Sequence, residues 1–207
     1  MTAWYLFSLP ALSAGIALVE TDSVLVGQWM LSRPLFVGPL TGLLCGDIQA
    51  GVVLGVLTEL FSVEGLPVGA SIPLNAAVAA GCAVLLSAGA WAVPMAAAFP
   101  AGLALGAGHQ RLETRVRHWR SGLTLRAAQA LGDGGPPGWR RLLLRSLGIH
   151  AAVTAAFVYA TVSVLGPALS WSWDAVPAAA RDAVSFAFEI GPWIGLAALV
   201  RAFAWKV

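Results

Sequence analysis

Residues 33–80 decide the fold of this chain, and they read RPLFVGPLTGLLCGDIQAGVVLGVLTELFSVEGLPVGASIPLNAAVAA. The stretch is apolar and rich in glycine, and its only acidic residues are Asp47, Glu59 and Glu64. A carboxylate near the centre of a bilayer costs about 2.5–3.5 kcal/mol on insertion scales. Such groups persist where they face a bundle interior, a partner or a substrate, so these three acids are candidates for function.

The composition indicates that this chain lies in a lipid bilayer. Hydrophobic residues make up 58% of the 207 residues and charged residues 11%, whereas soluble domains carry about 25% charged residues. We therefore expect an all-α integral membrane protein with a single membrane domain over residues 1–207.

Short apolar segments with a polar break lie in the middle of the decisive stretch. Residues 34–46 would form a helix of about 20 Å, which is shorter than a hydrocarbon core of about 30 Å. Residues 48–63 are also short and are interrupted by Glu59. We expect Gly46 to end the first helix and Asp47 to cap the second. The pattern predicts discontinuous or re-entrant helices around residues 34–75, and glycines four residues apart in both segments favour close helix packing.

The rest of the chain divides into an N-terminal core (1–109), a basic segment (110–146) and a C-terminal two-span hairpin (147–207). Further apolar helices are expected at 3–19, 75–90, 91–108, 147–165 and 183–204. A short interfacial helix is predicted at 21–31, and a polar link with two tryptophans at 166–181.

Positive charge is concentrated in one segment. Eight of the twelve Lys and Arg residues lie between Arg111 and Arg145. By the positive-inside rule this segment is cytoplasmic, and we expect a solvated loop with a turn at 132–138. Nothing around these arginines predicts a soluble nucleic-acid-binding fold, so nucleic acid is not expected as a partner.

The polar residues of the decisive stretch each have two interpretations. Asp47 either caps a helix or faces a cavity. Glu59 either binds two hydroxyls of a ligand, or forms an ion pair or a protonated, backbone-bonded group. Glu64 borders an irregular segment and either faces solvent or lines the site. Asn75 is a helix N-cap, a residue that binds the hydroxyls of a ligand, or both.

The sequence contains no nucleotide-binding loop and no motif with a catalytic nucleophile, so we expect no catalysis by this chain alone and no cofactor or metal. His109, His118 and His150 do not cluster in the sequence and are expected to be solvated or interfacial. Cys45 and Cys82 lie in apolar segments and are interpreted as small buried hydrophobic residues.

Four motifs carry a resemblance to a known family. They are Arg33-Pro34-Leu35, Cys45-Gly46-Asp47, Thr58-Glu59-Leu60, and V-G-A-S-I-P-L-N at residues 68–75. Together they resemble the membrane-embedded IIC subunits of mannose-type (mannose/fructose/sorbose) phosphotransferase systems. The resemblance covers roughly residues 10–110 well and 147–204 loosely.

The resemblance implies a sugar-translocating permease subunit in the inner membrane of a bacterium. It implies a related IID membrane subunit and soluble IIA and IIB phosphocarriers as partners, besides sugar and lipid, and a homo-oligomer is a further possibility. The substrate-binding residues that it suggests are Glu59, Asn75, Asp47, Ser71 and Glu64.

Two departures from the family pattern keep other functions open. Family members end the last motif in P-P-D, whereas this chain has Asn75, so we expect Asn75→Asp to improve sugar binding if this residue lies in the pocket. Family members also continue for two apolar segments beyond the region of 183–204, which suggests a short or C-terminally truncated variant. The alternative is a non-transporting scaffold or regulatory subunit; an intramembrane hydrolase using Asp47 and Glu59 has least support.

Overall fold

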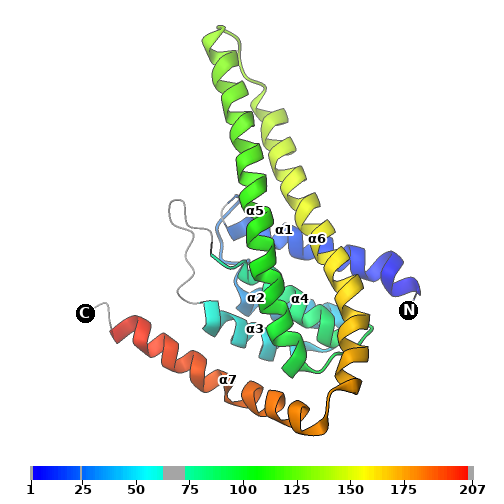
Figure 1. Cartoon of the computed structure of the whole chain (residues 1–207). Helices are drawn as coiled ribbons and strands as arrows, with labels where there is room; N and C mark the ends of the chain where they lie inside the picture. The colour runs from blue at the N-terminus through cyan, green and yellow to red at the C-terminus, as the bar shows by residue number, and fades with distance from the viewer. Residues whose placement is uncertain (1, 24, 63–72, 205–207) are drawn as a thin grey trace.

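The computed structural model describes residues 2–23, 25–62 and 73–204, and these residues form helices without any strand (Figure 1). In chain order the elements are η1 (Trp4–Ser8), α1 (Leu9–Glu20), η2 (Thr21–Ser23), α2 (Pro34–Cys45), α3 (Ile48–Ser62), α4 (Ala76–Ala88), α5 (Met95–Gly132), α6 (Trp139–Ala175) and α7 (Ala178–Ala204). Three helical stretches are long and apolar enough to cross a membrane, namely Trp4–Ser23, Trp139–Ala175 and Ala178–Ala204. The predicted all-α membrane fold is confirmed.

The predicted short helices are α2 and α3, and they form a tight hairpin. Gly46 ends α2 with φ 85°, and its N–H bonds to the carbonyls of Gly42 and Leu43. Asp47 then begins α3, because its Oδ1 accepts a hydrogen bond from the N–H of Ala50 at 2.9 Å. Both helix ends are therefore set by the local sequence, as expected from a left-handed glycine followed by an Asp cap.

Glycines line the contact between α2 and α3. A Cβ added at Gly42 would lie 2.5 Å from the carbonyl oxygen of Asp47 and 2.7 Å from the Cα of Gly51. Gly38 and Gly55 meet in the same way one turn along the hairpin. The four-residue glycine spacing thus serves backbone contact between the two short helices, as the sequence predicted.

Helix α4 lies at the centre of the protein. Ten of its thirteen residues are buried, and Val78 and Leu85 pack in one cluster with Ile16 of α1 and Val158 of α6. A helix that is apolar on all sides is stable only where other helices surround it. The start of α4 therefore lies inside the bundle, and Asn75, the N-cap residue of α4, lies at this start.

The basic segment forms helices and not the expected loop. It extends α5 to Gly132 and begins α6 at Trp139, so that the two helices project beyond the rest of the bundle as a long hairpin (Figure 1). Arg and Leu are the commonest residues of the segment and favour helix, and Val116, Leu123 and Ala127 are buried along one face of α5. The predicted turn at 132–138 is present between the helices.

The predicted interfacial helix at 21–31 is also wrong. After the single turn η2, residues 25–33 form a loop closed around Asp22, whose carboxylate accepts hydrogen bonds from the N–H groups of Trp29 at 2.8 Å and Leu31 at 2.7 Å. A carboxylate that collects several backbone donors competes with the helical hydrogen-bond pattern.

The polar link expected at 166–181 is mostly helix as well. α6 continues through Pro167 to Ala175, and only Val176 and Pro177 separate it from α7. Val176 has an extended backbone with φ −69° and ψ 133°, the conformation favoured by a residue that precedes a proline, and α6 ends there.

Candidate functional site

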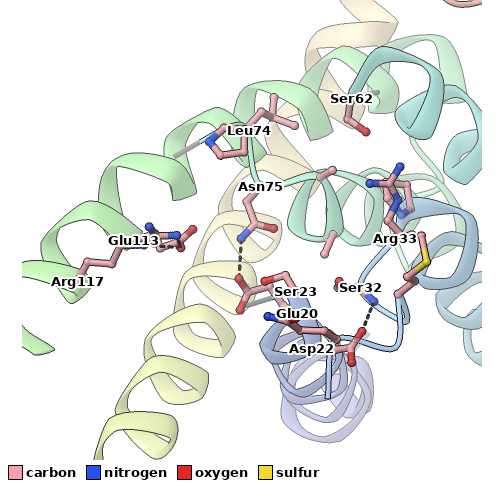
Figure 2. A pocket seen from close by; sticks show the side chains of 16 residues that line it. Glu20, Asp22, Ser23, Ser32, Arg33, Ser62, Leu74, Asn75, Glu113 and Arg117 are labelled. Carbon is pink, nitrogen blue, oxygen red and sulfur yellow. Dashed lines mark hydrogen bonds and ion pairs between the residues drawn. The ribbon is translucent and has the colours of Figure 1, made fainter. Parts of the chain in front are cut away.

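A polar cavity of about 330 Å³ lies where the end of α1, the loop before α2, the start of α4 and the middle of α5 meet. Its polar lining consists of Glu20, Asp22, Ser23, Gln28, Ser32, Arg33, Ser62, Asn75, Glu113 and Arg117. Figure 2 shows these side chains converging from separate segments of the chain. Paired acids, arginines, an amide and hydroxyls give the cavity both hydrogen-bond donors and acceptors.

Glu20 is the central group of this cavity. Its side chain is 2% exposed, and its two oxygens have different partners. Oε1 accepts from Asn75 Nδ2 at 2.9 Å, and Oε2 lies 2.5 Å from Nε2 of His150 on α6. A buried carboxylate of this kind persists because both oxygens are bonded.

Asn75 joins Glu20 to a second histidine. Its Oδ1 caps α4 by accepting from the N–H of Val78 at 3.0 Å, so its Nδ2 must be the donor to Glu20 and to Nδ1 of His109, 3.1 Å away. His109 Nδ1 is then an acceptor, and the ring proton lies on Nε2, which donates to Thr154 Oγ1 at 3.0 Å. This hydrogen-bond chain assigns a neutral Nε2–H tautomer to His109.

His109 and His150 correct the expectation that the histidines are solvated or interfacial. Their exposed fractions are 1% and 3%, because α5 and α6 face α1 and the start of α4 at this level. Sequence reasoning also missed Glu20. The available signal was an acid directly after the apolar run of 9–19, together with histidines at the edges of two other apolar segments.

The opposite wall of the cavity carries an ion pair from α5. Arg117 donates from Nε at 3.1 Å and from Nη2 at 2.8 Å, both to Oε1 of Glu113. The other oxygen of Glu113 has no hydrogen bond to a described residue. Asp22 also borders the cavity, but its carboxylate is occupied by the backbone of the 25–33 loop.

Glu59 does not line this cavity. Its Oε1 forms an ion pair with Arg33 Nη2, and its Oε2 accepts a 3.4 Å hydrogen bond from the N–H of Leu35. Arg33, by contrast, lines the cavity (Figure 2). Of the two interpretations of Glu59, the structure has the ion pair, and this ion pair joins α3 to the start of α2.

The other predicted site residues lie in different places. Asn75 caps α4, as one of its interpretations expected, and it also lines the cavity; its binding of sugar hydroxyls stays a prediction. Asp47 caps α3 and does not line the cavity. Glu64 and Ser71 lie outside the described residues.

The described residues contain no group of three or more His, Cys, Asp or Glu side chains that could hold a metal ion. The cavity presents hydrogen-bonding groups beside the buried carboxylates of Glu20 and Asp22. Such groups can bind the hydroxyls of a polar ligand.

The comparisons with known proteins agree with the fold. A family model described as the sorbose-specific IIC component of the phosphotransferase system matches residues 5–206. Among solved structures, one described only as a membrane protein has a TM-score of 0.78 and 21% identity, over 95% of this chain and 80% of its own. The cryo-EM structure of the mannose transporter ManYZ with microcin E492 has a TM-score of 0.68 and 19% identity, over 95% and 79%. No curated protein matches.

Proposed function

The chain belongs to the sorbose-specific IIC family of phosphotransferase-system components, and on that premise we propose that the cavity beside Glu20 holds the sugar that this membrane subunit transports. The observation that carries the proposal is the buried carboxylate of Glu20, held by Asn75 and His150 at the wall of a 330 Å³ cavity. A carboxylate with bonded partners is already ordered and desolvated, so it accepts a sugar hydroxyl at little further cost.

The surrounding groups suit the other hydroxyls of a sugar. The free oxygen of Glu113 is an acceptor, the guanidinium of Arg33 is a donor, and the Ser23 and Ser32 hydroxyls serve as either. All of them border the same cavity. A sugar needs donors and acceptors in alternation, and an apolar or singly charged ligand would leave most of these groups unpaired.

Substitution of Asn75 tests this site. The sequence led us to expect that Asn75→Asp improves sugar binding, whereas the contact between Asn75 and Glu20 leads us to expect the opposite. Asn75→Asp puts a carboxylate 2.9 Å from Glu20 Oε1 in place of the donor. We expect sugar affinity to fall about ten- to a hundredfold near neutral pH, the equivalent of one lost charge-assisted hydrogen bond. Acidification should restore part of it, because two adjacent carboxylates can share one proton.

The measurement is the equilibrium Kd of radiolabelled sugar in membranes, at several pH values. Asp47→Asn is the control. It also exchanges an acid and an amide at the start of a helix, but Asp47 lies outside the cavity. Tighter sugar binding by Asn75→Asp at all pH values would contradict the proposed site.

We propose that Glu59 supports the sugar site indirectly, by orienting Arg33. Glu59→Gln should lower the free energy of unfolding by about 1–3 kcal/mol, as for a lost charged hydrogen bond, and should weaken sugar binding less than tenfold. Glu189→Gln, an exposed glutamate on α7, is the matched control. Thermal unfolding and sugar Kd measured together separate the two roles. A hundredfold loss of affinity with unchanged stability would mean that Glu59 contacts the sugar directly.

The subunit works with other components of a mannose-type phosphotransferase system. We propose that these are a IID-type membrane subunit and soluble IIA and IIB phosphocarriers. We also propose that the protein is located in the inner membrane of a bacterium. Wide apolar surfaces support a membrane partner: along α7 only Gly191 and Gly195 are buried. The basic α5–α6 hairpin supports a cytoplasmic face for the phosphocarriers. Co-purification of a second membrane subunit in mild detergent checks this assignment.

A further inference from the structure

The 25–33 loop forms part of the wall of the polar cavity beside Glu20. It contributes Gln28, Met30, Ser32 and Arg33 to the lining. The other lining residues lie in helices or directly before α4. Among the described residues, the loop is therefore the longest stretch of the cavity wall without regular secondary structure.

The side chains of this loop do not hold it against the helix bundle. None of residues 25–33 is buried, and Trp29 and Met30 are 73% and 61% exposed. Arg33 alone forms an ion pair, with Glu59, and this fixes the C-terminal end of the loop. A segment with few buried apolar contacts opens more easily than the packed helices around it.

The carboxylate of Asp22 is the main attachment of the loop. Oδ1 accepts from the N–H of Trp29 at 2.8 Å. Oδ2 accepts from the N–H of Leu31 at 2.7 Å and, more weakly, from that of Ser32 at 3.4 Å (Figure 2). The other N–H groups of 27–33 that bond to described residues bond within the loop. One buried carboxylate thus holds the loop closed.

The backbone of the loop is strained in this closed form. Gln28 has φ 57° and Met30 has φ 68°, in the left-handed region that residues other than glycine rarely adopt. Among the described residues, Ala92 is the only other residue of this kind, and it lies outside the cavity. Strained residues cluster at ligand clamps and switch regions, where the strain is part of the mechanism.

We propose that the 25–33 loop is a flap over the cavity and that Asp22 is the latch that holds it closed. Opening breaks the hydrogen bonds to Asp22 and releases the left-handed backbone at Gln28 and Met30, so the released strain offsets part of the cost of opening. The identity of the ligand, a sugar, rests on the proposed function. The flap itself rests on the contacts, the exposure and the backbone of the loop.

Hydrogen exchange tests the latch without any ligand. The full-length protein in lipid nanodiscs is compared with Asp22→Asn, whose amide offers one acceptor oxygen in place of two. Exchange of the peptide 25–33 should become about tenfold faster, as for one lost charge-assisted hydrogen bond. Asp133→Asn, at an exposed acid between α5 and α6, is the matched control and should not change this peptide. Equal exchange in Asp22→Asn and the parent would overturn the latch.

Met30→Gly tests the strain when it is compared with Met30→Ala. Both variants remove the side chain beyond Cβ, but only glycine adopts φ 68° without a steric penalty. Exchange of the peptide 25–33 should be about two- to fivefold slower in Met30→Gly than in Met30→Ala. Ala92→Gly relieves a φ of 44° away from the cavity and should leave this peptide unchanged. Equal or faster exchange in Met30→Gly would show that the loop stores no strain.

The reactivity of a cysteine in the cavity measures access. Ala77 of α4 is buried and borders the cavity, so the Ala77→Cys thiol should react slowly with a neutral methanethiosulfonate reagent. Cys45→Ala removes the partly exposed native thiol, and Cys82 is fully buried. Adding Asp22→Asn should speed the reaction about tenfold, and adding Asp133→Asn should not. Unchanged reactivity with Asp22→Asn would mean that the loop does not cover the cavity, which contradicts the flap.

Sugar kinetics separate a flap from a loop that only contacts the sugar. If sugar must wait for the flap to open, association and dissociation both depend on opening. Asp22→Asn should therefore raise both rates about tenfold and change the Kd much less. The probe is whichever of mannose, fructose and sorbose the parent binds saturably. Faster dissociation with unchanged association would overturn the flap. If no sugar binds while the Ala77→Cys thiol still depends on Asp22, the proposed function fails and the flap stands.

Discussion

Glu20→Ala is expected to abolish sugar binding and to lower the free energy of unfolding by about 3–5 kcal/mol, the cost of removing one partner of a buried charged pair. The reason is that His150 is only 3% exposed and would stay buried after losing its hydrogen-bond partner, the Glu20 carboxylate 2.5 Å from its Nε2. The amide of Asn75 would also lose its acceptor. Chemical or thermal unfolding and equilibrium sugar binding measure the two effects.

A double variant separates stability from function at this pair. Glu20→Leu combined with His150→Leu removes both buried polar groups, and replacing a whole buried pair by apolar residues is often neutral for stability. The double variant should therefore unfold near the parent temperature and still fail to bind sugar. Sugar binding by this variant at parental affinity would show that Glu20 is structural and that the proposed site is wrong.

Gly42→Ala is expected to destabilise the protein by about 1–3 kcal/mol, the typical cost of overpacking a close contact. The added Cβ would lie 2.5 Å from the Asp47 carbonyl oxygen and 2.7 Å from the Cα of Gly51. Both neighbours are backbone atoms, so the two helices must move apart. The melting temperature of the purified protein measures the effect, and sugar binding should weaken as the α2–α3 hairpin shifts Arg33.

Gly15→Ala on α1 is the matched control for Gly42→Ala. A Cβ at Gly15 would meet no atom within 4 Å, and alanine is favoured over glycine in a helix by roughly 0.5–1 kcal/mol. This variant should be unchanged or slightly more stable. If both variants melt alike, the glycine contact does not hold the hairpin together.

Local features of the decisive stretch predicted its local structure well. Gly46 and Asp47 set the break between α2 and α3, and the glycine spacing predicted their close packing. The motifs that contain Arg33 and Glu59 pointed to the correct family, which the match over residues 5–206 confirms. Each of these signals depends on residues within a few positions of one another or on the sequence pattern itself.

The errors have an equally physical origin. The arginines between 111 and 145 indicated polarity but not conformation, so an expected loop is the extension of two helices. Asp22 determines the 25–33 loop by accepting backbone donors seven and nine residues away. No period of apolar residues reveals such contacts, because a side-chain acceptor replaces the regular backbone pattern.

The sequence by itself determined that this chain is a helical membrane protein of the IIC type with a broken pair of short helices. The helical membrane fold and the broken pair follow from composition, segment length and glycine position, which act locally, whereas the IIC type follows from the resemblance of four motifs to that family. Only the tertiary structure decided which polar groups meet. Along the chain, Asn75 lies 55 residues from Glu20, and His150 lies 130 residues from Glu20. They come together because the apolar α4 is buried between α1, α5 and α6, and this packing brings the end of α1, the start of α4 and the first half of α6 to one level.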